Sequence, residues 1–206
     1  SVMADPSGAI TTAAAMVALA EQCLRNEFSN DLSEQRVCVF GGTGPVGICI
    51  ALLAARSGAE CTIISHRGQD SAERAAEKLG DKYEVSLGGA DGSSTEAIRR
   101  WLPEVEVLFS AAKAGVQVLD SASLKHAASL RVIADANAVP PSGVEGVGAN
   151  DSASRIATAD DSTAFAFGAL AIGNVKYRVH TGLLQQMHDA EKPIYLAYDE
   201  AFATAS

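Results

Sequence analysis

The sequence predicts an α/β fold with a doubly wound parallel sheet and a helix at each end, on three observations. Short apolar runs alternate with helical patterns from residue 36 to residue 135, which is typical of the strands and crossover helices of a parallel sheet. Four glycines between residues 41 and 47 follow the first run and open an apolar helix pattern. The composition, 48% hydrophobic and 20% charged over 206 residues, is that of a folded globular protein.

Residues 1–30 are expected to form a strand end and a helix that leads into the sheet. "SVMAD" has a strand pattern, a Pro-Ser-Gly turn follows it, and apolar residues recur at helical spacing from Thr11 to Phe28. A strand at this position needs partners, and the sequence begins with Ser. We therefore expect a piece of a longer protein, with residues 1–30 as an interdomain segment.

Residues 31–172 are predicted to form a cofactor-binding domain, and residues 173–206 a helical segment that returns to a preceding domain. Apolar runs predict strands at 36–40, 60–65, 83–87, 105–112, 130–137 and 164–173. Periodic patterns predict helices at 45–57, 70–79, 94–102, 122–128 and about 174–190. Gly80 is expected to end one helix, and residues 136–163 are expected to be rich in loops.

The glycine cluster fits the dinucleotide-binding motif GxGxxG. Its residues are Gly42, Thr43, Gly44, Pro45, Val46 and Gly47, between a strand and a helix as the motif requires. The first glycine would permit a tight turn, the second would let the backbone approach a pyrophosphate, and the third would let the helix pack on the strand. Free N–H groups at the helix start bind the anion. The sequence therefore predicts a Rossmann-type domain.

A second spacing of the same glycines, GxxGxxG, fits short-chain dehydrogenases. Those enzymes usually carry a Tyr-x-x-x-Lys pair, and no tyrosine of this sequence has a lysine four residues later. This class is therefore disfavoured.

The end of the second strand of the motif indicates which dinucleotide is bound. An NAD site usually has a carboxylate there, whereas this chain has Ser65, His66 and Arg67. A hydroxyl, an imidazole and a guanidinium suit a 2′-phosphate. We therefore expect NADP, with NAD as the alternative in which Arg67 is only a solvated loop charge.

Charge and cysteine usage exclude several other classes. The net charge of −9 disfavours nucleic-acid binding, and no continuous apolar run is long enough to indicate a membrane partner. The four cysteines form no CxxC pair and have no histidine at ligand spacing. We expect no metal site and a reducing, cytoplasmic setting.

Four motifs together carry a resemblance to a known family. "ITTAAAMVAL", "GGTGPVG", "IADANAVPPSGVEG" and "FGALAIGNVKYRVH" resemble, in this order, segments of the methylene-tetrahydromethanopterin dehydrogenases of methylotrophic bacteria. They are also similar to the related enzyme that accepts methylene-tetrahydrofolate. The resemblance implies hydride transfer from the methylene carbon to NADP, giving the methenyl form in one-carbon (formaldehyde) oxidation. It also implies a pterin substrate, a homo-oligomer for the full-length protein, and an N-terminal domain outside this sequence.

The resemblance and the strand ends together suggest further site residues. Ser110 and Ala111 leave a strand with small side chains that would let the cofactor lie close, or they form an ordinary turn. Asn137 would hold the nicotinamide amide or ribose, or form an Asx turn. Lys176, placed in the first turn of a helix where a cation opposes the helix dipole, would position the pterin, or it is an exposed bystander. A non-catalytic NADP-binding module remains the alternative to an enzyme.

Overall fold

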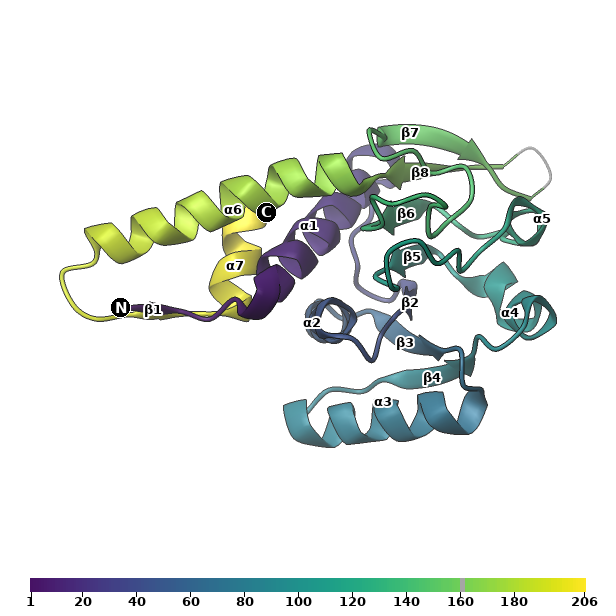
Figure 1. Cartoon of the computed structure of the whole chain (residues 1–206), viewed down its shortest axis with the longest axis horizontal. Coiled ribbons are helices and arrows are strands. Elements are labelled where there is room, and N and C mark those ends of the chain that lie inside the picture. The colour runs from purple at the N-terminus through teal and green to yellow at the C-terminus, as the bar shows by residue number, and fades with distance from the viewer. Residues whose placement is uncertain (160–161) are drawn as a thin grey trace.

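The computed structural model describes residues 1–159 and 162–206. Among these residues one sheet has seven strands, in the order β4-β3-β2-β5-β6-β8-β7 (Figure 1). Its strands are β2 (Arg36–Phe40), β3 (Glu60–Ser65), β4 (Gly88–Asp91), β5 (Val107–Ser110), β6 (Val132–Asp135), β7 (Ser152–Ala157) and β8 (Thr163–Phe167). All neighbours pair in parallel except β7 with β8. The chain runs outward from β2 on both sides, so the predicted doubly wound sheet is confirmed.

Helices cover both faces of this sheet. They are α1 (Ala9–Phe28), α2 (Pro45–Arg56), α3 (Gln69–Tyr83), α4 (Thr95–Trp101), α5 (Ser121–Leu124), α6 (Ala169–Asp189) and α7 (Tyr198–Ala205). Successive residues of a strand face opposite sides, so Val37 and Val39 belong to one apolar cluster while Cys38 and Phe40 belong to the other. Burial of both faces explains why these strands read as continuous apolar runs.

Helix α1 is a core helix that packs against α2, α6 and α7 (Figure 1). The segment Pro6–Phe28 is long and apolar enough to cross a membrane by length and composition alone, but 72% of its most apolar window is buried inside the protein. Asp5 caps the helix, because its carboxylate accepts the N–H groups of Ile10 and Thr11 at 2.9 and 3.1 Å and the Thr11 hydroxyl at 2.7 Å.

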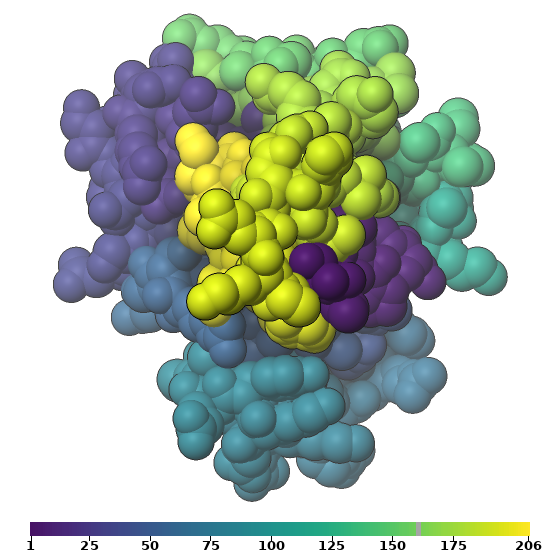
Figure 2. Space-filling model, turned by 90° about the vertical axis from the view of Figure 1, so that its left-hand side faces the viewer, coloured from purple at the N-terminus to yellow at the C-terminus, as the bar shows by residue number. Residues whose placement is uncertain are grey.

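The first strand finds its partner inside this chain. β1 (Val2–Met3) pairs in parallel with β9 (Tyr195–Leu196). Figure 2 shows the first residues, in purple, against the yellow C-terminal segment. The partner that the predicted N-terminal strand needs is therefore supplied by the C-terminal segment of the same chain.

The region after β3 differs from its prediction. α3 continues through Gly80 to Tyr83 and ends where Glu84 adopts a left-handed conformation with φ 56°. The predicted strand at 83–87 is therefore wrong, and the edge strand is the glycine-containing β4.

The last third of the chain also differs. The stretch 136–163, expected to be rich in loops, contains β7, which pairs with β8; its residues 160 and 161 lie outside the described part. The expected strand 164–173 ends at Phe167, and α6 begins at Ala169, five residues before its predicted start.

Candidate cofactor cleft

A cleft of about 640 Å³ lies at the carboxyl ends of β2, β3, β4 and β5. The connection from β2 leads to β3 on one side, and the connection from β5 leads to β6 on the other side. Open α/β sheets bind ligands at such a switch point in strand order. Four residues that the sequence singled out line the cleft: Thr43, Gly44, His66 and Ala111. The others among the predicted cofactor residues, Gly42, Pro45, Val46, Gly47, Ser65, Arg67, Ser110 and Asn137, lie outside its lining.

The tight turn of the glycine motif belongs to Gly41 rather than to Gly42. Gly41 has φ +72°, and a Cβ there would collide with the backbone of Ala111, so β2 and β5 leave the sheet in close contact. Gly42 packs on the sheet instead, because a Cβ would lie 2.7 Å from Cβ of Ile63. The prediction that Gly42 permits the tight turn was therefore wrong, because Gly41 has this role.

Gly44 and Gly47 have the surroundings that the motif predicts. Gly44 is the N-cap of α2, with Pro45 in the first turn, so the N–H groups of Val46 and Gly47 point out of the helix start without helical partners. A Cβ on Gly47 would collide with the carbonyl of Gly41 and lie 2.7 Å from Cα of Gly42. The helix therefore packs directly on the turn, and its start has the free N–H groups that an anion site requires.

The predicted phosphate-binding triplet follows β3. Ser65 is buried, and its Oγ accepts the N–H of Arg67 at 3.1 Å. His66 lines the cleft. Arg67 is exposed and forms no salt bridge with any residue that the structure describes. The guanidinium is therefore available to a ligand.

Sequence analysis missed the far wall of the cleft. Ser93 and Ser94 line it from the loop after β4, Thr95 from the start of α4, and Lys113 from the loop after β5. Asp91, which pairs with Ser65 across β3 and β4, orders this wall, because its Oδ1 accepts the Ser93 N–H at 2.8 Å. Hydrogen bonds from Ser93 hold the pKa of Asp91 below its ordinary value. The sequence Asp-Gly-Ser-Ser at 91–94 indicates a turn, but the strand that leads to it was predicted at 83–87 instead of at β4.

Ser110 and Asn137 are both turned inward. The Ser110 hydroxyl is buried without a hydrogen-bond partner among the described residues. The Asn137 side chain accepts two backbone N–H groups and donates to one carbonyl, and its bond to Val139 is the Asx turn named as the alternative.

Comparison with known proteins identifies the chain. No model of a known protein family matches it. It is 35% identical over 204 residues to the NAD(P)-dependent methylenetetrahydromethanopterin dehydrogenase of Methylorubrum extorquens, covering 99% of this chain and 68% of that protein. The chain belongs to this family.

A second relative and a solved structure are also similar to the chain. The bifunctional protein MdtA of the same organism is 31% identical over 95% of this chain and 64% of its own length. A transhydrogenase from Sinorhizobium meliloti shares the fold, with a TM-score of 0.57 at 12% identity over 96% of this chain and 53% of that one. The predicted resemblance and fold class are therefore confirmed.

In this dehydrogenase-family chain Lys176 does not lie in the first helical turn. Because α6 begins at Ala169, Lys176 is about two turns inside it, beyond the reach of the helix-start dipole. Its side chain crosses to the turn before α1, where a Cβ on Gly8 would lie 2.5 Å from Nζ. The residue is half-buried and forms no salt bridge among the described residues.

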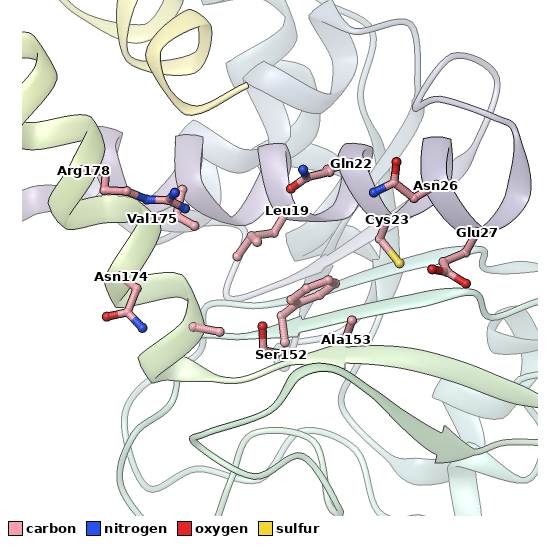
Figure 3. A pocket seen from close by; sticks show the side chains of 12 residues that line it. Leu19, Gln22, Cys23, Asn26, Glu27, Ser152, Ala153, Asn174, Val175 and Arg178 are labelled. Atoms are coloured by element: carbon pink, nitrogen blue, oxygen red, sulfur yellow. The ribbon is translucent and has the colours of Figure 1, made fainter.

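A second pocket, of about 450 Å³, lies between α1, β7 and α6. Figure 3 shows polar side chains around it, among them Gln22, Asn26, Glu27 and Arg178. Burial, with a contribution from Glu27, raises the pKa of Cys23 to about 11, so this thiol stays protonated near neutral pH. None of the predicted site residues lines this pocket, and no cluster of three metal-binding side chains occurs among the described residues.

Proposed function

We propose that the chain is the cofactor-binding part of an NADP-dependent dehydrogenase that oxidises methylene-tetrahydromethanopterin to the methenyl form, in one-carbon (formaldehyde) oxidation. The observation that carries this proposal is the glycine turn at the mouth of the cleft in a member of this family. The cleft of about 640 Å³ lies across the ends of four strands, which is where open α/β sheets bind ligands.

Three loops of the chain would each bind a different part of the cofactor. The Gly42–Gly47 turn would bind the pyrophosphate through the N–H groups at the start of α2. Ser65, His66 and Arg67 would surround the 2′-phosphate, and the small side chain of Ala111 would leave room for the nicotinamide. Ser110 would not touch the cofactor, since its hydroxyl is buried and faces Gly143.

Hydride transfer from the methylene carbon would need no general acid or base from the protein. When bound, the nicotinamide would supply the hydride acceptor, and the positive charge of the methenyl product would be shared by the two nitrogens next to its carbon. The protein has to hold donor and acceptor carbons about 3–3.5 Å apart and exclude water. Lys176 would contribute by positioning the pterin. The four cysteines are free and buried, which supports a reducing, cytoplasmic setting. A homo-oligomer is proposed for the full-length protein on the family resemblance alone.

Calorimetric titration of this chain with NADP⁺ and then NAD⁺ tests the cofactor assignment. Tighter binding of NADP⁺ supports the proposal. An assay with methylene-tetrahydromethanopterin and methylene-tetrahydrofolate in parallel then identifies the substrate. Cofactor binding without turnover of either would favour a non-catalytic module, and binding of neither nucleotide would contradict the site.

Arg67→Ala is expected to weaken NADP⁺ binding about tenfold or more while changing NAD⁺ binding less than twofold, because a charge-assisted contact to phosphate contributes about 1.5–3 kcal/mol. Arg74→Ala, an exposed arginine on the neighbouring α3, is the control. The measurement is the ratio of the two dissociation constants. Equal weakening of both nucleotides would remove the basis for phosphate recognition by Arg67.

Lys176→Gln is expected to lower kcat/KM for the methylene-pterin about 10–100-fold, by loss of one charged contact, while the dissociation constant for NADP⁺ changes less than twofold. Lys192→Gln, in the exposed loop after α6, is the control. Steady-state kinetics and cofactor titration provide the two values. Unchanged turnover in Lys176→Gln would show that this lysine is a bystander.

A further inference from the structure

One wall of the cofactor cleft is a loop with few bonds of its own. Six residues between 111 and 118 line the cleft: Ala111, Ala112, Lys113, Val116, Gln117 and Val118. Within this stretch one backbone bond is formed, from the Val116 N–H to the Lys113 carbonyl at 3.1 Å. The position of this wall must therefore be set by what lies behind it.

Behind the wall lies the loop that follows β6, and Asn137 joins the two. Asn137 Oδ1 accepts the Gly115 N–H at 3.2 Å and the Val139 N–H at 3.0 Å. Its Nδ2 donates to the Pro141 carbonyl at 2.9 Å. These bonds use both lone pairs of the oxygen and one of the two N–H groups. Asn137 is thus a bridge between the loops.

The same loop holds the far end of the wall through its backbone. The Gly143 carbonyl accepts the Val118 N–H at 2.7 Å and the Leu119 N–H at 3.2 Å. The Glu145 N–H donates to the Leu119 carbonyl at 2.9 Å. The wall is therefore held in its middle, at Gly115, and at its C-terminal end by one segment.

Asp135 anchors this segment to the sheet. It is the last residue of β6 and only 1% exposed. Its Oδ1 accepts the Asn137 N–H at 3.1 Å, and its Oδ2 accepts the Val144 N–H at 2.9 Å, so one carboxylate holds both ends of the loop. Gly143 has to be glycine, because a Cβ there would collide with the Ser110 hydroxyl and lie 2.7 Å from Asp135 Oδ1.

From this geometry we propose that Asp135 and Asn137 are positioning residues for the cofactor: they fix the wall formed by residues 111–118 and do not touch the cofactor themselves. The inference rests on the proposed function, since it assumes that this cleft holds the dinucleotide. It replaces the direct contact between Asn137 and the nicotinamide that the sequence suggested, because the Asn137 oxygen is fully used inside the protein.

The test compares Asn137→Ala and Asn137→Asp with the control Asn150→Ala. Asn150 is exposed and lies beyond the loop that Asp135 anchors. Asn137→Asp keeps the oxygen that accepts from Gly115 and Val139. Hydrogen–deuterium exchange of the 206-residue chain without cofactor measures how well the backbone of the wall is protected. Titration with NADP⁺ measures the affinity for the cofactor, and the midpoint of thermal unfolding gives the stability of each variant. We expect Asn137→Ala to exchange at least about tenfold faster at residues 113–119 and to bind NADP⁺ about tenfold more weakly, the effect of one or two lost hydrogen bonds.

Asn137→Asp should recover most of the protection and most of the affinity, which a direct amide contact to the nicotinamide would not allow. Unchanged exchange at residues 113–119 in Asn137→Ala would overturn the inference. Equal loss of NADP⁺ affinity in both Asn137 variants with normal exchange would also overturn it and would indicate direct contact. Failure of the unchanged chain to bind either nucleotide would instead contradict the proposed function, and the exchange comparison would still decide whether Asn137 holds the wall.

Discussion

Gly44→Asp is expected to fold normally and to lose NADP⁺ affinity by at least about a hundredfold. Gly44 has φ −84° and ψ 166°, which any residue adopts, and the nearest atom to a Cβ is the Gly41 carbonyl oxygen at 3.3 Å. Aspartate is also a favourable N-cap. Its carboxylate, however, would stand where the pyrophosphate binds, and two charges about 4 Å apart near a protein surface repel by about 4 kcal/mol.

Gly44→Asn is the matched control, because asparagine caps helices as well as aspartate does and has the same shape without the charge. Calorimetry gives the affinities and thermal unfolding the stabilities. Affinity should fall much further in the Asp variant than in the Asn variant. Normal NADP⁺ binding by Gly44→Asp would show that this turn does not hold the pyrophosphate, while equal losses in both variants would attribute the effect to size.

Gly47→Ala is expected to lower the free energy of unfolding by about 3 kcal/mol or more, at the upper end of overpacking costs. The added methyl group would collide with the Gly41 carbonyl and lie 2.7 Å from Cα of Gly42. Both are backbone atoms of a turn that is itself pressed against Ala111, so no flexible side chain is available to move. Cofactor binding should be lost with the shape of the turn.

Gly173→Ala is the control for this change. Gly173 also lies inside a helix, α6, and a Cβ there would have nothing within 4 Å. Alanine should therefore stabilise that helix by up to about 1 kcal/mol. Denaturant unfolding of the two variants should shift in opposite directions. A Gly47→Ala variant as stable as the unchanged chain would mean that α2 does not need its close approach to the turn.

The inner strands and the glycine turn were predictable because their causes are local. β2, β3, β5 and β6 are buried on both faces, so each shows as a short apolar run in the sequence. The turn combines a strand, glycines and a helix start within twelve residues. Such signals depend on neighbours in the chain, and pattern analysis detects them.

The edge strand β4 was missed because its cause lies elsewhere in the chain. A Cβ on Gly89 would collide with the backbone N–H of Glu73 in α3, so glycine is required for packing in a place where it weakens a strand by propensity. The short elements β9 and α7 likewise depend on distant partners: β9 pairs with β1, and α7 packs on α1. No local pattern marks either of them.

The site was predictable only in part for a similar reason. Lys113 and the Ser93–Thr95 loop meet Thr43 and His66 only because four strands end at one edge. The Asp-Gly-Ser-Ser sequence before Thr95 indicates a turn, but no local pattern shows that this turn faces the glycine motif. Lys176 was placed in the wrong turn because the α6 start is hidden in the continuous apolar run "AFAFGALAIG", where strand and helix share one pattern.

The packing of α1 has a consequence for the order of events during synthesis. This helix ends at residue 28, yet two of the helices that cover it, α6 and α7, end at residues 189 and 205. At about 5–20 residues per second, its most apolar surface waits roughly ten to thirty-five seconds for them to leave the ribosome. The nascent chain is thus most vulnerable to aggregation through the segment that becomes the centre of the finished core.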